Sequence, residues 1–124
     1  MIKYEHDAHL SSRILHIVSS LGLHHDLARV ACIRSRGSTS RRTLARCHAL
    51  PRIMQKALNV NAHYVIELVS ENFDKLSDEE QTKTIIHELM HIPKGMKGGF
   101  RYHDYVCSRN VDELYKKYKR TLNN

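Results

Sequence analysis

The stretch SDEEQTKTIIHELMHIP, residues 77–93, reads as a helix with both ends marked in the sequence. Ser77 and Glu80 form the S-x-x-E pattern of a capping box, which predicts the first turn of a helix. Pro93 cannot continue the helix, so we expect it to end after Ile92. Two histidines therefore lie on a short helix with well-defined ends.

The spacing of these histidines predicts a metal site. His87 and His91 are four residues apart, so their rings project from one face of the helix and can bind one ion. Glu88 stands about 100 degrees round the helix from His87, beside the ion, where a carboxylate can accept the proton of a metal-activated water. The pattern H-E-x-x-H predicts one catalytic zinc ion, with His87 and His91 as ligands and Glu88 as the catalytic base.

A catalytic zinc site needs a third protein ligand and an open position for water. His103 follows the motif after the glycine-containing loop PKGMKGGF, residues 93–100, which can bring the chain back to the helix. We predict that His103 is the third metal ligand. Asp104 and Glu113 remain alternatives, since a carboxylate can replace the third imidazole.

One class of zinc peptidase is excluded by the residues after the motif. Metzincins require H-E-x-x-H-x-x-G-x-x-H, but Lys94 and Lys97 occupy the positions of the glycine and the third histidine. An oxyanion stabiliser is also expected, and Tyr102, Tyr105, Arg101 and His48 are candidates among which the sequence does not select.

The segments before the motif alternate between helix and strand patterns. Residues 10–21 have apolar side chains at helical spacing, with Asp7 as a cap and Gly22 as a stop. The segments LARVACIRS (27–35) and RTLARCHAL (42–50) flank a turn-forming RGSTS and predict a hairpin with a basic tip.

Three more elements complete the sequence pattern. PRIMQKALN (51–59) predicts a short helix whose Ile53, Met54 and Leu58 pack inward. AHYVIELVS (62–70) is the clearest strand; at a sheet edge it would align an extended peptide, and in the sheet interior it would not touch substrate. NVDELYKKYKRTL (110–122) predicts a final helix.

Composition limits the class of protein. A chain of 124 residues with 41% hydrophobic residues fits one globular domain. The start, MIKYEHDAHLSSR, lacks the apolar core of a signal peptide, and no apolar run is long enough for a membrane span. We therefore expect a cytoplasmic protein with no membrane partner.

The net charge of +7 favours acidic partners. The segment from Arg29 to Lys56 contains eight basic side chains and no acid, which is the pattern of a nucleic-acid footprint. A solvated basic surface is the alternative interpretation, because no aromatic side chains interleave with these arginines as in a base-stacking platform.

Long segments of the chain resemble a known group of proteins. SRGSTSRR (35–42), ARCHALPRIMQKAL (45–58), YVIELVSENFDKLS (64–77) and IIHELMHIPKGMKGGFRYHDY (85–105) look like the small SprT-like or minigluzincin metallopeptidases, most closely short predicted metallopeptidases from archaea. The resemblance implies a single metallopeptidase domain over residues 1–124. Its implied fold is α+β and zincin-like, with a small mixed sheet of three to four strands on which an N-terminal helix and the H-E-x-x-H helix pack.

The resemblance also implies a function and its residues. It implies a zinc metalloendopeptidase that hydrolyses protein or peptide substrates, with zinc held at His87, His91 and His103 and with Glu88 catalytic. Some SprT-like relatives digest proteins crosslinked to DNA through an attached cysteine-rich module, which this chain lacks. The alternative is a basic nucleic-acid-binding module in which zinc is structural; three protein ligands plus water distinguish the enzyme from that module.

Overall fold

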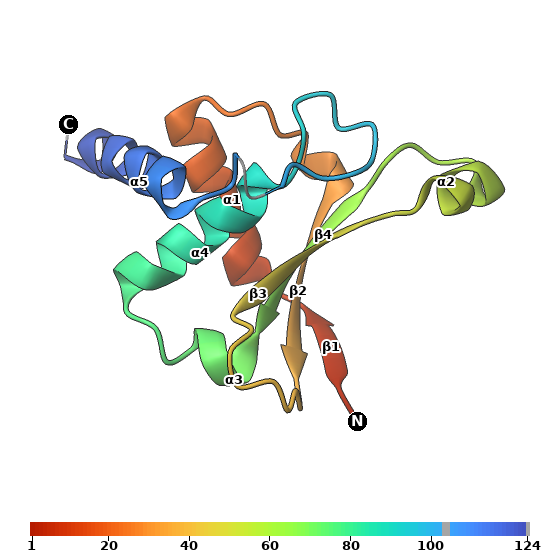
Figure 1. The fold of residues 1–124 in the computed structure, drawn as a ribbon, viewed down its shortest axis with the longest axis horizontal. Helices are drawn as coiled ribbons and strands as arrows, with labels where there is room; N and C mark the ends of the chain where they lie inside the picture. The colour runs from red at the N-terminus through yellow and green to blue at the C-terminus, as the bar shows by residue number, and fades with distance from the viewer. Residues whose placement is uncertain (103–104, 124) are drawn as a thin grey trace.

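The computed structural model describes residues 1–102 and 105–123. Strands and helices alternate along most of the chain, and two long helices close it (Figure 1). The elements are β1 (Lys3–His6), α1 (Ala8–Leu21), the 3₁₀ turn η1 (Leu27–Arg29), β2 (Val30–Arg36), β3 (Ala45–Ala49), α2 (Arg52–Leu58), β4 (Tyr64–Val69), α3 (Ser70–Phe73), α4 (Asp78–Met90) and α5 (Ser108–Leu122).

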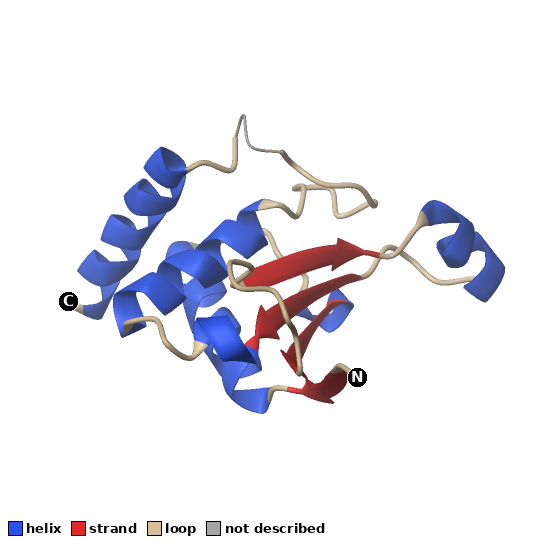
Figure 2. Cartoon of the chain, turned by 60° about the horizontal axis from the view of Figure 1, so that its bottom comes forward, coloured by secondary structure: helices blue, strands red, loops and turns tan. Residues whose placement is uncertain are grey.

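The strands form one mixed sheet in the order β1-β2-β4-β3. β4 runs parallel to β2 and antiparallel to β3, and β1 pairs antiparallel with β2. The helices α1, α4 and α5 gather on one side of this sheet (Figures 1 and 2). The predicted fold, α+β with a small mixed sheet that carries the first helix and the H-E-x-x-H helix, is confirmed, with the short strand β1 added before the first helix.

The main core lies between the sheet and these helices. Ile14 of α1, Ile66 of β4 and Ile85 of α4 are at most 1% exposed and belong to one apolar cluster. Val111 of α5 joins it from the outer side of α4. Burial of these side chains supplies most of the energy that holds α4 against the sheet.

The predicted hairpin between residues 27 and 50 is wrong. Both of its strands form, as β2 and β3, but β4 lies between them and pairs with each. The physical reason is burial: Ile66 and Val69 of β4 are 0% exposed, so this strand takes the central position, where both faces are covered. The strand at 62–70 is therefore interior, and β3 is an edge strand.

The predicted inward packing of the short helix is also wrong. α2 begins after Pro51 and ends at Asn59 in a left-handed conformation, as its sequence indicates. However, Ile53 is 77% exposed and Leu58 is 58% exposed, because α2 projects away from the rest of the molecule (Figure 1). Helical spacing predicts a helix but does not show whether another element lies against it.

Both ends of α1 and the start of α4 match their sequence signals, whereas α4 ends at Met90 and not, as predicted, after Ile92. The Asp7 carboxylate accepts the N–H of Leu10, and Gly22 adopts φ 61° after the last turn of α1. Ser77 and Glu80 form the complete capping box of α4. None of the helices formed by residues 1–102 and 105–123 is both long and apolar enough to cross a bilayer.

Candidate metal centre

Helix α4 presents the motif residues toward β3. Ile85, Ile86 and Leu89 are 0% exposed and face the core, which fixes the rotation of the helix about its axis. His87 and Glu88 therefore lie on another face, and His91 continues that face as the residue that ends the helix. The core side of α4 thus decides where the motif points.

The two histidines converge. The Nε2 atoms of His87 and His91 are 3.2 Å apart. Two nitrogens that share one tetrahedral zinc at about 2.0–2.1 Å would be separated by about 3.3 Å. The separation of the two rings therefore fits a shared ion, although an N–H···N hydrogen bond has the same length.

The loop after α4 orients the second ring. The Nδ1–H of His91 donates to the carbonyl of Arg101 at 2.6 Å, and the amide of Arg101 donates to the carbonyl of His91 at 2.7 Å. In the neutral ring this leaves the lone pair on Nε2, the atom that faces His87. The glycine-containing loop thus returns to the motif at residue 101, as its composition predicts.

Glu88 is buried beside these rings. It is 7% exposed, and its carboxylate lies 3.9 Å from Nε2 of His87. Burial raises the pKa of Glu88 to about 7. A carboxyl group with a pKa near neutrality is suited to accept and return a proton at physiological pH.

The candidate ligands stand as follows. Among the described residues, His87, Glu88 and His91 form a group whose ligand atoms lie within 4.8 Å of one another. Glu113 is not in this group: it pairs with Arg109 on α5 and its side chain is 65% exposed. His103 and Asp104 lie outside the described residues, so their predicted roles stay predictions.

Two hollows meet at Glu88. The larger, of about 440 Å³, lies between α4, the start of α5 and the start of β3, and its walls include Ala45 and Val111. The smaller, of about 170 Å³, lies on the His91 side and is lined by Cys47, Glu88, His91, Phe100 and Tyr102. Together they form a cleft along β3 with the candidate catalytic carboxylate at its centre.

The structure separates the candidate oxyanion stabilisers. Tyr102 shares the smaller hollow with Glu88, whereas Arg101 and Tyr105 line a cavity on another face of α4. His48 bonds to Glu67 at 2.8 Å on the opposite face of the sheet from Cys47. Tyr102 is thus the only one of the four that lines either hollow at Glu88.

Two residues of the smaller hollow were missed from sequence. Cys47 and Phe100 line the hollow beside His91 and Glu88. The alternation of β3 places Cys47 and His48 on opposite faces, but the sequence does not show which face meets α4. Phe100 carries no signal beyond its position in the returning loop.

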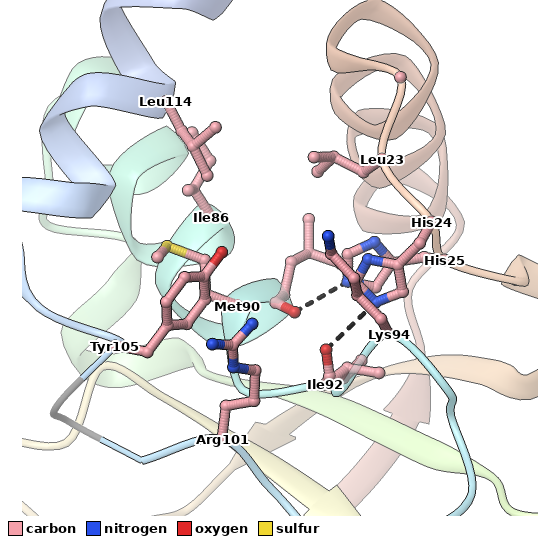
Figure 3. Close-up of a pocket in the computed structure, with 12 residues that line it drawn as sticks. Leu23, His24, His25, Ile86, Met90, Ile92, Lys94, Arg101, Tyr105 and Leu114 are labelled. Atoms are coloured by element: carbon pink, nitrogen blue, oxygen red, sulfur yellow. Dashed lines mark hydrogen bonds between the residues drawn. The ribbon is translucent and has the colours of Figure 1, made fainter.

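A further cavity lies behind α4 (Figure 3). It has a volume of about 360 Å³ and is lined by residues from the end of α1, from α4, from α5 and from the loop after α4. Neither His87 nor Glu88 lines it. This cavity is therefore separate from the cleft along β3.

The basic segment from Arg29 to Lys56 is partly neutralised. Four of its arginines form ion pairs, the closest at 2.7 Å, and one of them reaches the buried Glu67. The paired arginines are Arg29, Arg34, Arg36 and Arg46. Since four of the eight basic side chains in this segment pair with acidic side chains of the same chain, the structure gives no support to the predicted nucleic-acid interface.

Comparison with known protein families identifies a metallopeptidase family. A family model described as "Putative phage metallopeptidase" matches residues 2–123. Comparison with curated proteins and with solved structures finds no match. The family match spans nearly the whole chain and includes the cleft, the H-E-x-x-H helix and the returning loop. The chain therefore belongs to this phage metallopeptidase family, with its His-Glu-His group in a small metallopeptidase-like α+β domain.

Proposed function

We propose that the protein is a zinc-dependent metalloendopeptidase. His87, His91 and His103 hold one zinc ion, and Glu88 is the catalytic base. The observation that carries this proposal is the 3.2 Å separation of two imidazole Nε2 atoms beside a buried carboxylate. The family match supports metal-dependent peptidase activity.

The bound zinc, His91 and Glu88 have different roles in the proposed hydrolysis. When bound, zinc supplies Lewis-acid polarisation of the carbonyl and lowers the pKa of water. His91 is held by the Arg101 carbonyl in the tautomer that leaves Nε2 for the ion. A carboxylate oxygen of Glu88 takes a proton from the attacking water and then delivers it to the leaving amine.

The free edge of strand β3 can bind an extended peptide substrate by main-chain hydrogen bonds. The N–H of Val69 donates to the Leu44 carbonyl and the N–H of Leu50 donates to the His63 carbonyl, which fixes the alternation of hydrogen bonds along β3. The main-chain groups of Ala45 and Cys47 consequently face away from β4. An extended peptide can pair with them as an added strand and pass Glu88.

The resemblance of the long segments to SprT-like and minigluzincin peptidases is the finer part of the proposal. It supports His103 as the third ligand and, together with the composition, a cytoplasmic location. No observation on the described residues favours the nucleic-acid-binding alternative.

Metal analysis beside a proteome-derived peptide cleavage assay tests the proposal. We expect about one zinc per chain in the wild type and in Glu88→Gln, with cleavage reduced about 100-fold or more in Glu88→Gln because its base is gone. Glu113→Gln is the matched control, since Glu113 is exposed on α5, and should cleave normally. Normal cleavage by Glu88→Gln would contradict the assignment of the base.

A further inference from the structure

The cavity behind α4 has walls of two different kinds. Figure 3 shows Leu23, Ile86 and Leu114 at one end. Lys94 and Arg101 enter from the loop after α4 at the other end. An apolar end and a cationic end match a ligand with an apolar tail and an anionic head.

The charged side chains among the described residues that line this cavity are both basic. No acidic side chain is among its described lining residues, and neither Lys94 nor Arg101 forms an ion pair with a described residue. The guanidinium of Arg101 stacks on the ring of Tyr105, 3.4 Å from its centroid, which orients it without neutralising it. Two cations are therefore available to an anionic group.

Two stacked histidines complete the wall. The Nε2–H groups of His24 and His25 donate to the carbonyls of Ile92 and Leu89, at 3.2 and 2.8 Å. Burial lowers the pKa of both rings, and the nearby Lys94 and Arg101 lower that of His24 further, so the rings are neutral near pH 7. The neutral histidines therefore leave the charge of this cavity to Lys94 and Arg101.

We propose that this cavity binds a small amphipathic carboxylate with an aliphatic chain of about eight carbons. A ligand of this size suits the cavity, whose volume is near the lower end of the range for small-molecule sites. The chain lies against Leu23, Ile86 and Leu114. The carboxylate is recognised by Lys94 and Arg101. The main chain of Arg101 also holds His91, so one residue contacts both this ligand and the candidate metal centre.

Isothermal titration with four probes tests the ligand chemistry. Octanoate has both the tail and the charge, 1-octanol lacks the charge, acetate lacks the tail, and octylammonium reverses the charge. We expect octanoate to bind at least tenfold more tightly than each of the others. Equal binding of octanoate and 1-octanol, or no octanoate binding at millimolar concentration, would overturn the proposal.

Variants locate the site. The double substitution Lys94→Leu and Arg101→Leu should weaken octanoate binding about tenfold and leave 1-octanol binding unchanged. Lys97→Leu is the matched control, because Lys97 is an exposed lysine of the same loop outside the cavity wall, and it should bind octanoate as the wild type does. If the double variant does not fold, Lys94→Leu alone should weaken octanoate binding about threefold. Unchanged octanoate affinity in the folded variant would overturn the proposal, as would an equal loss in Lys97→Leu.

Discussion

At the level of single residues, the buried carboxylate of Glu67 has a structural role, because it holds together side chains from three strands. Glu67 is 3% exposed on β4 and accepts hydrogen bonds from Ser35 at 2.6 Å, from His48 at 2.8 Å and from Arg46 at 3.2 Å. Its ion pair with Arg46 links the central strand β4 to the edge strand β3. Ser35 lies on β2 and His48 lies on β3, the two strands that flank β4 in the sheet. These partners therefore follow from the order of the strands and not from the sequence near Glu67.

Glu67 should make the free energy of unfolding depend on pH. Burial raises the pKa of this carboxyl, but the hydrogen bonds from Ser35 and His48 and the charge of Arg46 outweigh it, so the pKa lies below 4.5. Its contribution is therefore present above about pH 4.5 and is lost as the pH falls through the lowered pKa.

Urea unfolding at pH 7 and at acid pH measures this contribution. Glu67→Gln should lower the free energy of unfolding at pH 7 by about 1–3 kcal/mol and flatten its acid dependence. Glu5→Gln is the control, because the Glu5–Arg36 pair is exposed and such pairs contribute about 0–1 kcal/mol. An unchanged acid limb in Glu67→Gln would contradict this role.

At the scale of elements, helix ends are set locally and helix faces are not. Asp7, Gly22 and Ser77 mark ends that the structure confirms, because caps depend on residues within one turn. The end expected from Pro93 comes early, since α4 ends at Met90 with His91 as its cap. The predicted packing of α2 failed, since packing depends on which elements meet in space. The wrong hairpin has the same origin, because β4 enters between two strands that are consecutive in the chain.

The N-terminal cap of α4 can be tested by one substitution. Ser77→Ala removes the hydroxyl that accepts the N–H of Glu80, so we expect a loss of about 1 kcal/mol in the free energy of unfolding, measured by urea titration. Ser12→Ala, at an exposed position inside α1, is the control and should cost nothing. Equal effects of the two changes would argue against the cap.

The exposure of α2 also predicts a contrast. Ile53→Ser should change the free energy of unfolding by less than about 0.5 kcal/mol, because its side chain already meets solvent. Ile85→Ala, in the core side of α4, should cost about 2–5 kcal/mol. A large loss in Ile53→Ser would mean that α2 packs against another surface in solution.

At the scale of the whole molecule, the fold class and the motif helix could be predicted from the sequence, but the cleft could not. Periodicity identifies α1 and β4, and the signals at its ends identify α4. The small mixed sheet with helices packed on it was implied by the resemblance to known metallopeptidases. The cleft is formed by β3, α4 and the returning loop, and Cys47 and Phe100 both line it. That these two residues lie close together could be predicted only from the strand order of the sheet. The roles of His87, Glu88 and His91 remain predictions from the motif, now with a geometry that fits them.

Metal binding should stabilise the whole domain if the ion joins α4 to the loop after it. Zinc at about 100 times its dissociation constant should add about 2.7 kcal/mol to the free energy of unfolding, and a chelator should remove it. His87→Ala should abolish this zinc-dependent shift, whereas His63→Ala, an exposed histidine away from the cleft, should retain it. A full zinc shift in His87→Ala would place the ion elsewhere.

The crystal structure of the zinc-loaded protein, with the ion located by its anomalous scattering, would test the proposed zinc site. We predict one zinc within about 2.1 Å of Nε2 of both His87 and His91, with His103 as the third ligand and a fourth position open to solvent beside Glu88. A zinc ion closed by four protein ligands, or bound away from His87 and His91, would contradict the proposed enzyme.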